Sequence, residues 1–253
     1  MSKADGGIDQ LGRRAKIGVL VPATNTVAAP ECEALRPPGV TNHVSRMAPA
    51  RRPTDDMEGY RASIGRGEDA ARDAIDLVVP CEPGAILLGH SIDSFLGGVA
   101  GAERLAADLT EHGGVPVVVP SLAAAAALET LGGIRRIALL TPYMPPGDEV
   151  SEAFFSDAGY EVKRVLGLRC AGALAIAEVP AERIEEALDE LDGDDVEAIV
   201  QAGTNLPMAH LIAGAEARLG KPVLSINVAG YWQALRDLGV DDAVPGFGAL
   251  LER

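Results

Sequence analysis

The order of predicted strands and helices in the first half of the chain recurs in the second half. Residues 13–22 run from basic residues through an apolar stretch to a proline, and residues 133–142 do the same. A Pro-Val strand then precedes a helix in each half, at residues 115–121 and 221–227. Chance similarity between apolar runs would not keep these landmarks in one order. The sequence therefore predicts a duplicated α/β unit, folded as two pseudo-twofold-related lobes.

The apolar runs indicate parallel strands that are buried on both faces. They are continuous rather than alternating, which is what a parallel sheet covered by helices requires. We expect each lobe to be a mostly parallel sheet flanked by helices, with an active-site cleft between the lobes. The predicted boundaries are a flexible N-terminal tail at 1–15, a first lobe at 16–121 plus 226–253, and a second lobe at 122–225.

Charge and composition exclude several classes of function. The formal net charge of −15 argues against a nucleic-acid-binding surface. No uninterrupted apolar run reaches about 18 residues, so no membrane span is predicted. Residues 1–14 lack an apolar signal core and are interpreted as a tail. Three irregularly placed cysteines form neither a disulfide framework nor a zinc pattern, which fits a cytoplasmic protein.

Two predicted strands end in clusters of small and polar residues. Ligands collect beyond the carboxyl ends of strands in an open parallel sheet, so we expect the chemistry at these two places. The first tip, after residues 84–88, consists of Gly89, His90, Ser91, Asp93 and Ser94. The second tip, after residues 197–202, consists of Gly203, Thr204 and Asn205, which offer N–H groups and a helix start.

His90 is the most reactive of the tip residues. An imidazole can exchange a proton near neutral pH, so His90 is predicted to be a catalytic acid or base; the alternative is a structural histidine. Ser91, Asp93 and Ser94 would orient the imidazole or bind substrate, or else cap the following helix. His90 and Asp93 are too few for a metal site, and the remaining histidines show no ligand spacing, so no metal is predicted. These remaining histidines are His43, His112 and His210.

The loops after the first strand of each half supply further polar groups. Thr24, Asn25 and Thr26 offer hydroxyls, an amide and helix N-terminal N–H groups, which together suit a carboxylate. Capping of the next helix is the alternative, and it does not exclude binding. Tyr143 takes the equivalent place in the second half, where a phenol could act as an acid or donate to a developing enolate. A tyrosine that packs with its hydroxyl in water is the alternative there.

Five segments carry a family resemblance. They are residues 18–26, 88–98, 141–143, 201–207 and 225–236. Together they resemble the maleate cis-trans isomerase and arylmalonate decarboxylase branch of the aspartate/glutamate racemase superfamily, in that family's order and over nearly the whole chain from Lys16. The resemblance implies a two-lobed, pseudo-twofold α/β fold and a homo-oligomer, dimeric or higher.

The resemblance also implies that the usual thiol chemistry is missing. Racemases and maleate isomerases of this family use two cysteines, one at each tip, as nucleophile or as paired acid and base. In this chain those positions fall at His90 and Gly203, and the cysteines present (Cys32, Cys81, Cys170) lie elsewhere. Arylmalonate decarboxylases keep only the second cysteine, which this chain lacks too. The family's Asp-Asn pair near Leu168 is replaced by residues 169–172.

The residues expected to bind a carboxylate remain: Asn25 with its threonines, Tyr143 and the N–H groups around Ser91 and Thr204. We therefore expect a cofactor-independent isomerase- or lyase-type enzyme that acts on a small mono- or dicarboxylate. His90 would move the proton, in a decarboxylation, hydration, elimination or isomerisation. The first alternative is a carboxylate-binding protein of the same fold that has lost catalysis. A nucleotide-binding Rossmann protein is a weaker alternative, because neither first loop carries the G-x-G-x-x-G spacing.

Overall fold

The computed structural model describes residues 9–48, 58 and 67–253, which form two four-stranded parallel sheets. The first has the order β2-β1-β3-β4 and the second the order β6-β5-β7-β8. The strands of the first sheet are β1 (Ala15–Pro22), β2 (Val40–Met47), β3 (Ala85–Leu88) and β4 (Val117–Val118). Those of the second are β5 (Arg136–Thr141), β6 (Glu161–Gly167), β7 (Ala198–Gln201) and β8 (Val223–Ser225). Identical strand order in the two halves confirms the predicted fold class.

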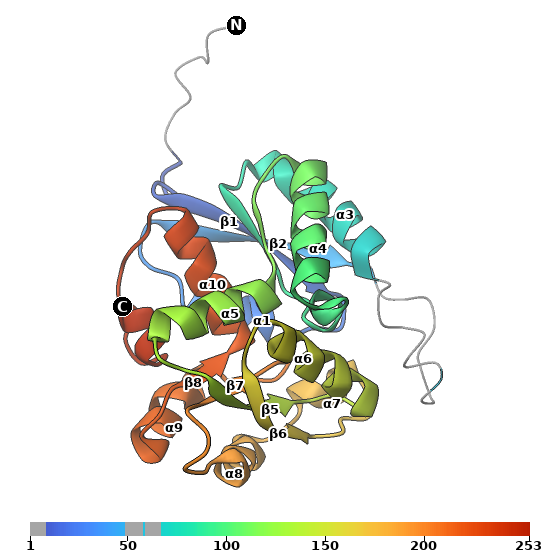
Figure 1. The fold of residues 1–253 in the computed structure, drawn as a ribbon. Coiled ribbons are helices and arrows are strands. Elements are labelled where there is room, and N and C mark those ends of the chain that lie inside the picture. Colours follow the sequence, from blue (N-terminus) through green and yellow to red (C-terminus); the bar gives the residue numbers. More distant parts are fainter. Residues whose placement is uncertain (1–8, 49–57, 59–66) are drawn as a thin grey trace, which may run out of the picture.

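Helices cover the first sheet on both faces (Figure 1). On the outer face lie α3 (Gly67–Val78) and α4 (Gly98–Gly113), whose apolar residues form a separate cluster with Leu20, Ile86 and Leu88. Between the two lobes lie α1 (Ala28–Ala34), α5 (Pro120–Leu131) and α10 (Ile226–Asp237). The cluster that contains them continues into the second lobe, so the two lobes share one hydrophobic core.

The second sheet carries the helices of the second half (Figure 1). They are α6 (Pro145–Asp157), α7 (Ala173–Ala177), α8 (Ala181–Leu191) and α9 (Ile212–Leu219). Short 3₁₀ helices complete the fold: η1 (Val79–Cys81), η2 (Ile92–Phe95), η3 (Ala209–Leu211) and η4 (Ala249–Glu252). No helix of the described residues is long and apolar enough to cross a membrane.

Helix α10 follows the last strand of the second sheet but packs against the first. Its buried face lies on β3 and α5. A Cβ atom added at Gly230 would lie 2.7 Å from Cδ1 of Leu87, in β3. Glycine at this position therefore allows the helix to approach the sheet closely.

An aromatic cluster joins the lobes. Phe95, in η2 after the first tip, lies with its ring centroid 5.6 Å from that of Phe154 and 6.0 Å from that of Phe155, both in α6. All three rings are buried. Edge-on and tilted arrangements at these distances are favourable for aromatic pairs, so the cluster links the first tip to the second lobe.

The structure differs from the predicted elements in a few places. The sequence pattern predicts a closing helix over residues 231–238, but α10 begins at Ile226, and residues 226–230 are buried between the lobes. Asn227 is therefore in the first turn of a helix. Neither α7 nor η4 was predicted, since each is a short segment stabilised by tertiary packing rather than by a strong local pattern. The sequence pattern also predicts an amphipathic helix over residues 60–79. Its residues 60–66, like residues 1–8 of the predicted tail, lie outside the described residues.

Candidate functional site

The first and second tips meet at a buried hydrogen-bond chain. The hydroxyl oxygens of Ser91 and Tyr143 lie 2.7 Å apart, and the N–H of Thr204 donates to Ser91 Oγ at 3.2 Å. The Tyr143 hydroxyl donates its single proton to the carbonyl of Ala202 at 2.9 Å. Consequently Ser91 donates to Tyr143. The Tyr143 hydroxyl and the Thr204 N–H, both from the second lobe, thus converge on Ser91 Oγ of the first lobe.

The loop after β1 joins the same network. Asn25 Oδ1 accepts the N–H groups of Val27 (3.0 Å) and Ala28 (2.9 Å), so Asn25 does cap α1. Its Nδ2 donates to Thr204 Oγ1 at 3.3 Å, which adds a contact between the lobes. Asn25 therefore caps α1 and contacts the second tip at the same time.

Thr24 and Thr26 take part through their main chains. The N–H of Thr26 donates to Asn205 Oδ1 at 2.9 Å, and Asn205 Nδ2 donates to the carbonyl of Ala173 at 2.6 Å. A longer contact of 3.5 Å joins Asn205 Nδ2 to the carbonyl of Thr24. The N–H of Thr26, one of the groups predicted for an anion cradle, is thus already paired with the second tip.

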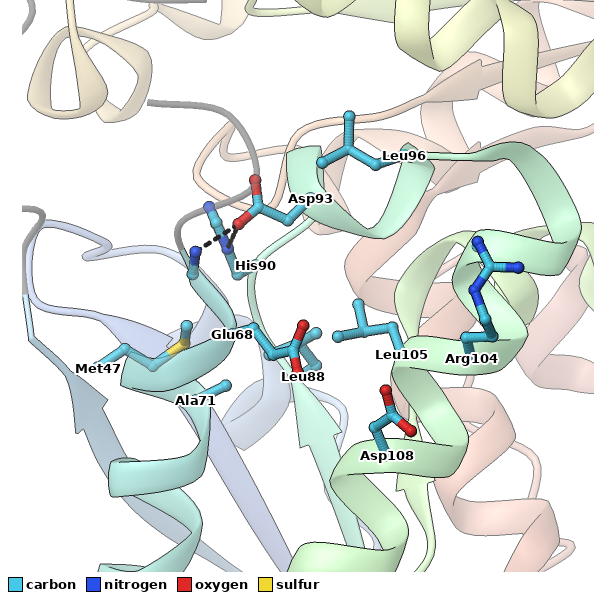
Figure 2. Close-up of a pocket in the computed structure, with 12 residues that line it drawn as sticks. Met47, Glu68, Ala71, Leu88, His90, Asp93, Leu96, Arg104, Leu105 and Asp108 are labelled. Carbon is cyan, nitrogen blue, oxygen red and sulfur yellow. Dashed lines mark hydrogen bonds and ion pairs between the residues drawn. The ribbon is translucent and has the colours of Figure 1, made fainter. Parts of the chain in front are cut away.

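His90 and Asp93 point into a different space. They line a cavity of about 220 Å³ that is bounded by α3, α4, η2 and the ends of β2 and β3, all in the first lobe (Figure 2). His90 Nδ1 lies 3.7 Å from Asp93 Oδ2, and that oxygen accepts the N–H of Gly67 at 2.7 Å. The His90 side chain is 25% exposed. Because His90 and Ser91 are consecutive, the imidazole and the hydrogen-bond chain start from Cα atoms about 3.8 Å apart.

Ser94 serves the local turn. Its hydroxyl donates to the carbonyl of Ser91 at 2.6 Å, and its own carbonyl accepts the hydroxyl of Ser121 at 2.7 Å. The structure therefore joins predicted site residues of both lobes through hydrogen bonds: Ser91, Tyr143, Thr204, Asn25 and Asn205. Ser94 supports the main chain of Ser91, whereas His90 and Asp93 line the separate cavity of the first lobe.

A buried carboxylate was missed by sequence reasoning. Glu31, in α1, accepts the N–H groups of Met208 and Ala209 at 2.8 Å each and the Asn227 amide at 2.6 Å. The same amide donates to the carbonyl of Thr204 at 3.0 Å. Burial raises the pKa of Glu31, against the lowering effect of these donors. Nothing in the sequence distinguishes Glu31 from the solvated glutamates of other helices.

A second missed group supports Tyr143. Arg169 Nη1 donates to the Tyr143 carbonyl at 3.2 Å and pairs with Asp148, which also accepts the Thr141 hydroxyl. Arg169 has a φ of 57°, in the left-handed region that non-glycine residues rarely adopt. It lies in the loop after β6, where the resemblance implies an Asp-Asn pair and this chain has residues 169–172. This loop therefore holds the main chain of Tyr143.

The cysteines are unsuited to nucleophilic chemistry at the tips. Burial raises the pKa values of the Cys32 and Cys170 thiols, which disfavours their thiolates. Cys81 is exposed at η1. Among the described residues, no group of three or more His, Cys, Asp or Glu side chains could hold a metal ion.

Gly203 leaves no room for a side chain. A Cβ atom there would lie 2.5 Å from Pro142 Cγ and 2.6 Å from Pro142 Cδ. We expect Gly203→Ala to lower the free energy of unfolding by about 1–3 kcal/mol, because a proline ring cannot move aside without shifting its loop. Urea unfolding measures this loss. Adding Gly203→Ala to a Pro142→Ala chain should cost less than about 0.5 kcal/mol.

Gly214→Ala is the matched control for this substitution. Gly214 is in α9, and an added Cβ there meets no atom within 4 Å. The control should stabilise the protein by about 0.5–1 kcal/mol, since alanine favours helices over glycine. Equal effects at Gly203 and Gly214 would contradict the proposed collision with Pro142.

A family model and individual relatives of known function point to the same family. Residues 17–251 match a protein family described as arylmalonate decarboxylase. The chain is 32% identical to a maleate isomerase of Nocardia farcinica over 248 residues, covering 94% of this chain and 96% of that protein. It is 32% identical to an arylmalonate decarboxylase of Bordetella bronchiseptica over 203 residues, covering 77% and 80%.

Solved structures share the fold. Nocardia farcinica maleate cis-trans isomerase, in a mutant with a covalently bound succinylcysteine intermediate, superposes with a TM-score of 0.84. The two chains are 29% identical in that comparison, which covers 94% of this chain and 98% of the other.

Proposed function

Because the chain belongs to the arylmalonate decarboxylase family, we propose that it is a cofactor-independent lyase or isomerase that acts on a small mono- or dicarboxylate. Membership confirms the resemblance predicted from the five segments. The reaction would run without a thiol at either tip, because His90 and Gly203 occupy the cysteine positions that the resemblance implies.

The convergence on Ser91 Oγ carries this proposal. The Tyr143 hydroxyl and the main-chain N–H of Thr204, both from the second lobe, lie 2.7 and 3.2 Å from Ser91 Oγ of the first lobe. A carboxylate oxygen that replaced the Ser91–Tyr143 contact would receive up to three donors. Donors aimed at a developing enolate are worth roughly 3 kcal/mol each in transition-state stabilisation, so this cluster suits reactions next to a carboxylate.

A site with His90 as its single acid or base suits decarboxylation better than racemisation, which needs two bases. In a decarboxylation, the C–C bond to the leaving carboxylate breaks, CO₂ departs and the electron pair forms an enediolate. The donors around Ser91 would hold that enediolate. A protonated His90 would give its proton to the carbon after its ring turns from the first-lobe cavity toward Ser91, the neighbouring residue. Two-base racemisation and a cysteine-adduct isomerisation fit this chain poorly, since neither tip carries a thiol.

A binding protein without catalysis is the second candidate. It is favoured by the absence of a thiol from both cysteine positions that the resemblance implies, His90 and Gly203. The Pro142 ring fills the space that a side chain at Gly203 would need. A ligand would have to replace existing hydrogen bonds in either case. The two candidates differ only in turnover.

A ligand screen with a turnover assay tests the proposal. We expect phenylmalonate or maleate to raise the melting temperature, because a ligand at 100 times its Kd stabilises the native state by about 2.7 kcal/mol. Release of CO₂ or formation of fumarate measures turnover. Ser91→Ala should abolish the shift, and the same change at Ser156, outside the tips, should preserve it. Binding without turnover would favour the second candidate, and neither binding nor turnover would contradict the proposal.

A homo-oligomer and a cytoplasmic location also belong to the proposal.

A further inference from the structure

Gln201 is a fully buried amide at the end of β7, two residues before Gly203. Its Nε2 donates to the carbonyl of Gly203 at 2.6 Å. Its Oε1 accepts the hydroxyl of Ser225 at 3.1 Å. The carbonyl of Gly203 accepts only from the NH₂ end of the amide, so this contact by itself fixes which way the amide faces. Both ends of the side chain are therefore committed.

The carbonyl of Gly203 and the N–H of Thr204 belong to the same peptide unit. That unit is planar and trans, so its C=O and N–H point in opposite directions. Gln201 holds the carbonyl on one side, and the N–H consequently points to the other side, where it reaches Ser91 Oγ at 3.2 Å. The N–H of Leu206 also donates to this carbonyl, at 3.1 Å, so the Gln201 side chain and the turn after Gly203 together set the direction of the donor at the second tip.

For this peptide unit, a side-chain restraint in addition to the Leu206 turn has a physical reason. Glycine populates conformations that other residues avoid, so a peptide bond next to Gly203 can rotate more readily than one between two substituted residues. Rotation would turn the carbonyl toward Ser91 and place an acceptor where an anion is to bind. The next carbonyl, of Thr204, is held separately by Asn227.

We propose that Gln201 is a positioning residue, which keeps the Thr204 N–H directed at the carboxylate or enolate oxygen of the substrate. The inference rests on the proposed function. It assigns Gln201 no contact with the substrate. Its role is to exclude the rotated peptide, in which the site would repel an anion.

Three variants test this role. Gln201→Met removes both hydrogen bonds at similar volume, and Gln201→Glu keeps an acceptor for Ser225 while placing carboxylate oxygens against the Gly203 carbonyl. Ser225→Ala is the matched control, because it leaves the same buried amide one partner short without releasing Gly203. The measurements are kcat/KM and Kd for phenylmalonate and maleate, at a temperature well below each melting temperature.

We expect Gln201→Met and Gln201→Glu to lower kcat/KM about 10- to 100-fold, as loss of one anion-stabilising donor does. Ser225→Ala should change it less than about threefold at a comparable loss of stability. If kcat/KM follows stability equally in all three variants, Gln201 is merely structural and the inference is wrong. If the wild type binds ligands without turnover, the Kd values of the three variants are compared in place of kcat/KM. If the wild type neither binds nor turns over these ligands, the proposed function is contradicted, not the role of Gln201.

Discussion

Replacing His90 by glutamine is expected to lower kcat/KM about 10²- to 10⁴-fold, the range that a positioned acid or base contributes. Glutamine retains a polar side chain but cannot transfer a proton near neutral pH. At the first tip, His90 is the group that can do so, and Asp93 lies 3.7 Å from its Nδ1, where it can orient the ring. Phenylmalonate and maleate should still raise the melting temperature of the variant, since the donors around Ser91 remain.

His112→Gln is the control for this experiment. His112 is in α4, away from the tips, and its Nε2 also contacts a carboxylate, Asp76, at 2.9 Å. It should leave kcat/KM unchanged. A His90→Gln variant that is as active as the control would remove His90 from the mechanism, and the donors of the tips would then have to act without it.

Phe95→Ala is expected to lower the free energy of unfolding by about 3–5 kcal/mol, as buried phenylalanine truncations do. Phe95 contacts two aromatic rings of the second lobe, and all three are buried, so the truncation leaves a cavity where the lobes meet. For a chain of this length, the melting temperature should fall by about 6–20 °C. Urea unfolding gives the free energy directly.

Two further variants check the explanation. Leu77→Ala should change stability by less than about 0.5 kcal/mol, because Leu77 is 72% exposed on α3. Phe95→Leu should lose less than Phe95→Ala, since it fills part of the cavity. If Phe95→Ala costs no more than Leu77→Ala, the aromatic cluster does not hold the lobes together.

The fold was predictable because its main signals are local and repeated. Continuous apolar runs indicate parallel strands, and their repetition indicates two similar sheets. The same reasoning located the two tips, since parallel strands bring their carboxyl ends to one edge of a sheet. Ser91, Thr204 and Asn25 were selected in this way, and the structure connects them.

The partners of each tip residue could not be predicted, because they depend on how the lobes pack. Glu31 shows this most clearly. Glutamate is usually solvated, and only the approach of Met208 and Asn227 from distant parts of the chain makes a buried carboxylate possible. Likewise, the direction of the His90 ring into a cavity of the first lobe follows from the position of α3 and η2, which no local pattern specifies.

The path of α10 has a consequence for synthesis on the ribosome. The last strand of the first sheet ends at Val118, yet the helix that packs on β3 starts at Ile226. At 5–20 residues per second, the roughly one hundred residues in between take about 5–20 s to emerge. During that interval Leu87 and its neighbours on β3 lack the helix that covers them in the folded protein, so this apolar part of the first sheet stays uncovered until the second half of the chain has been made.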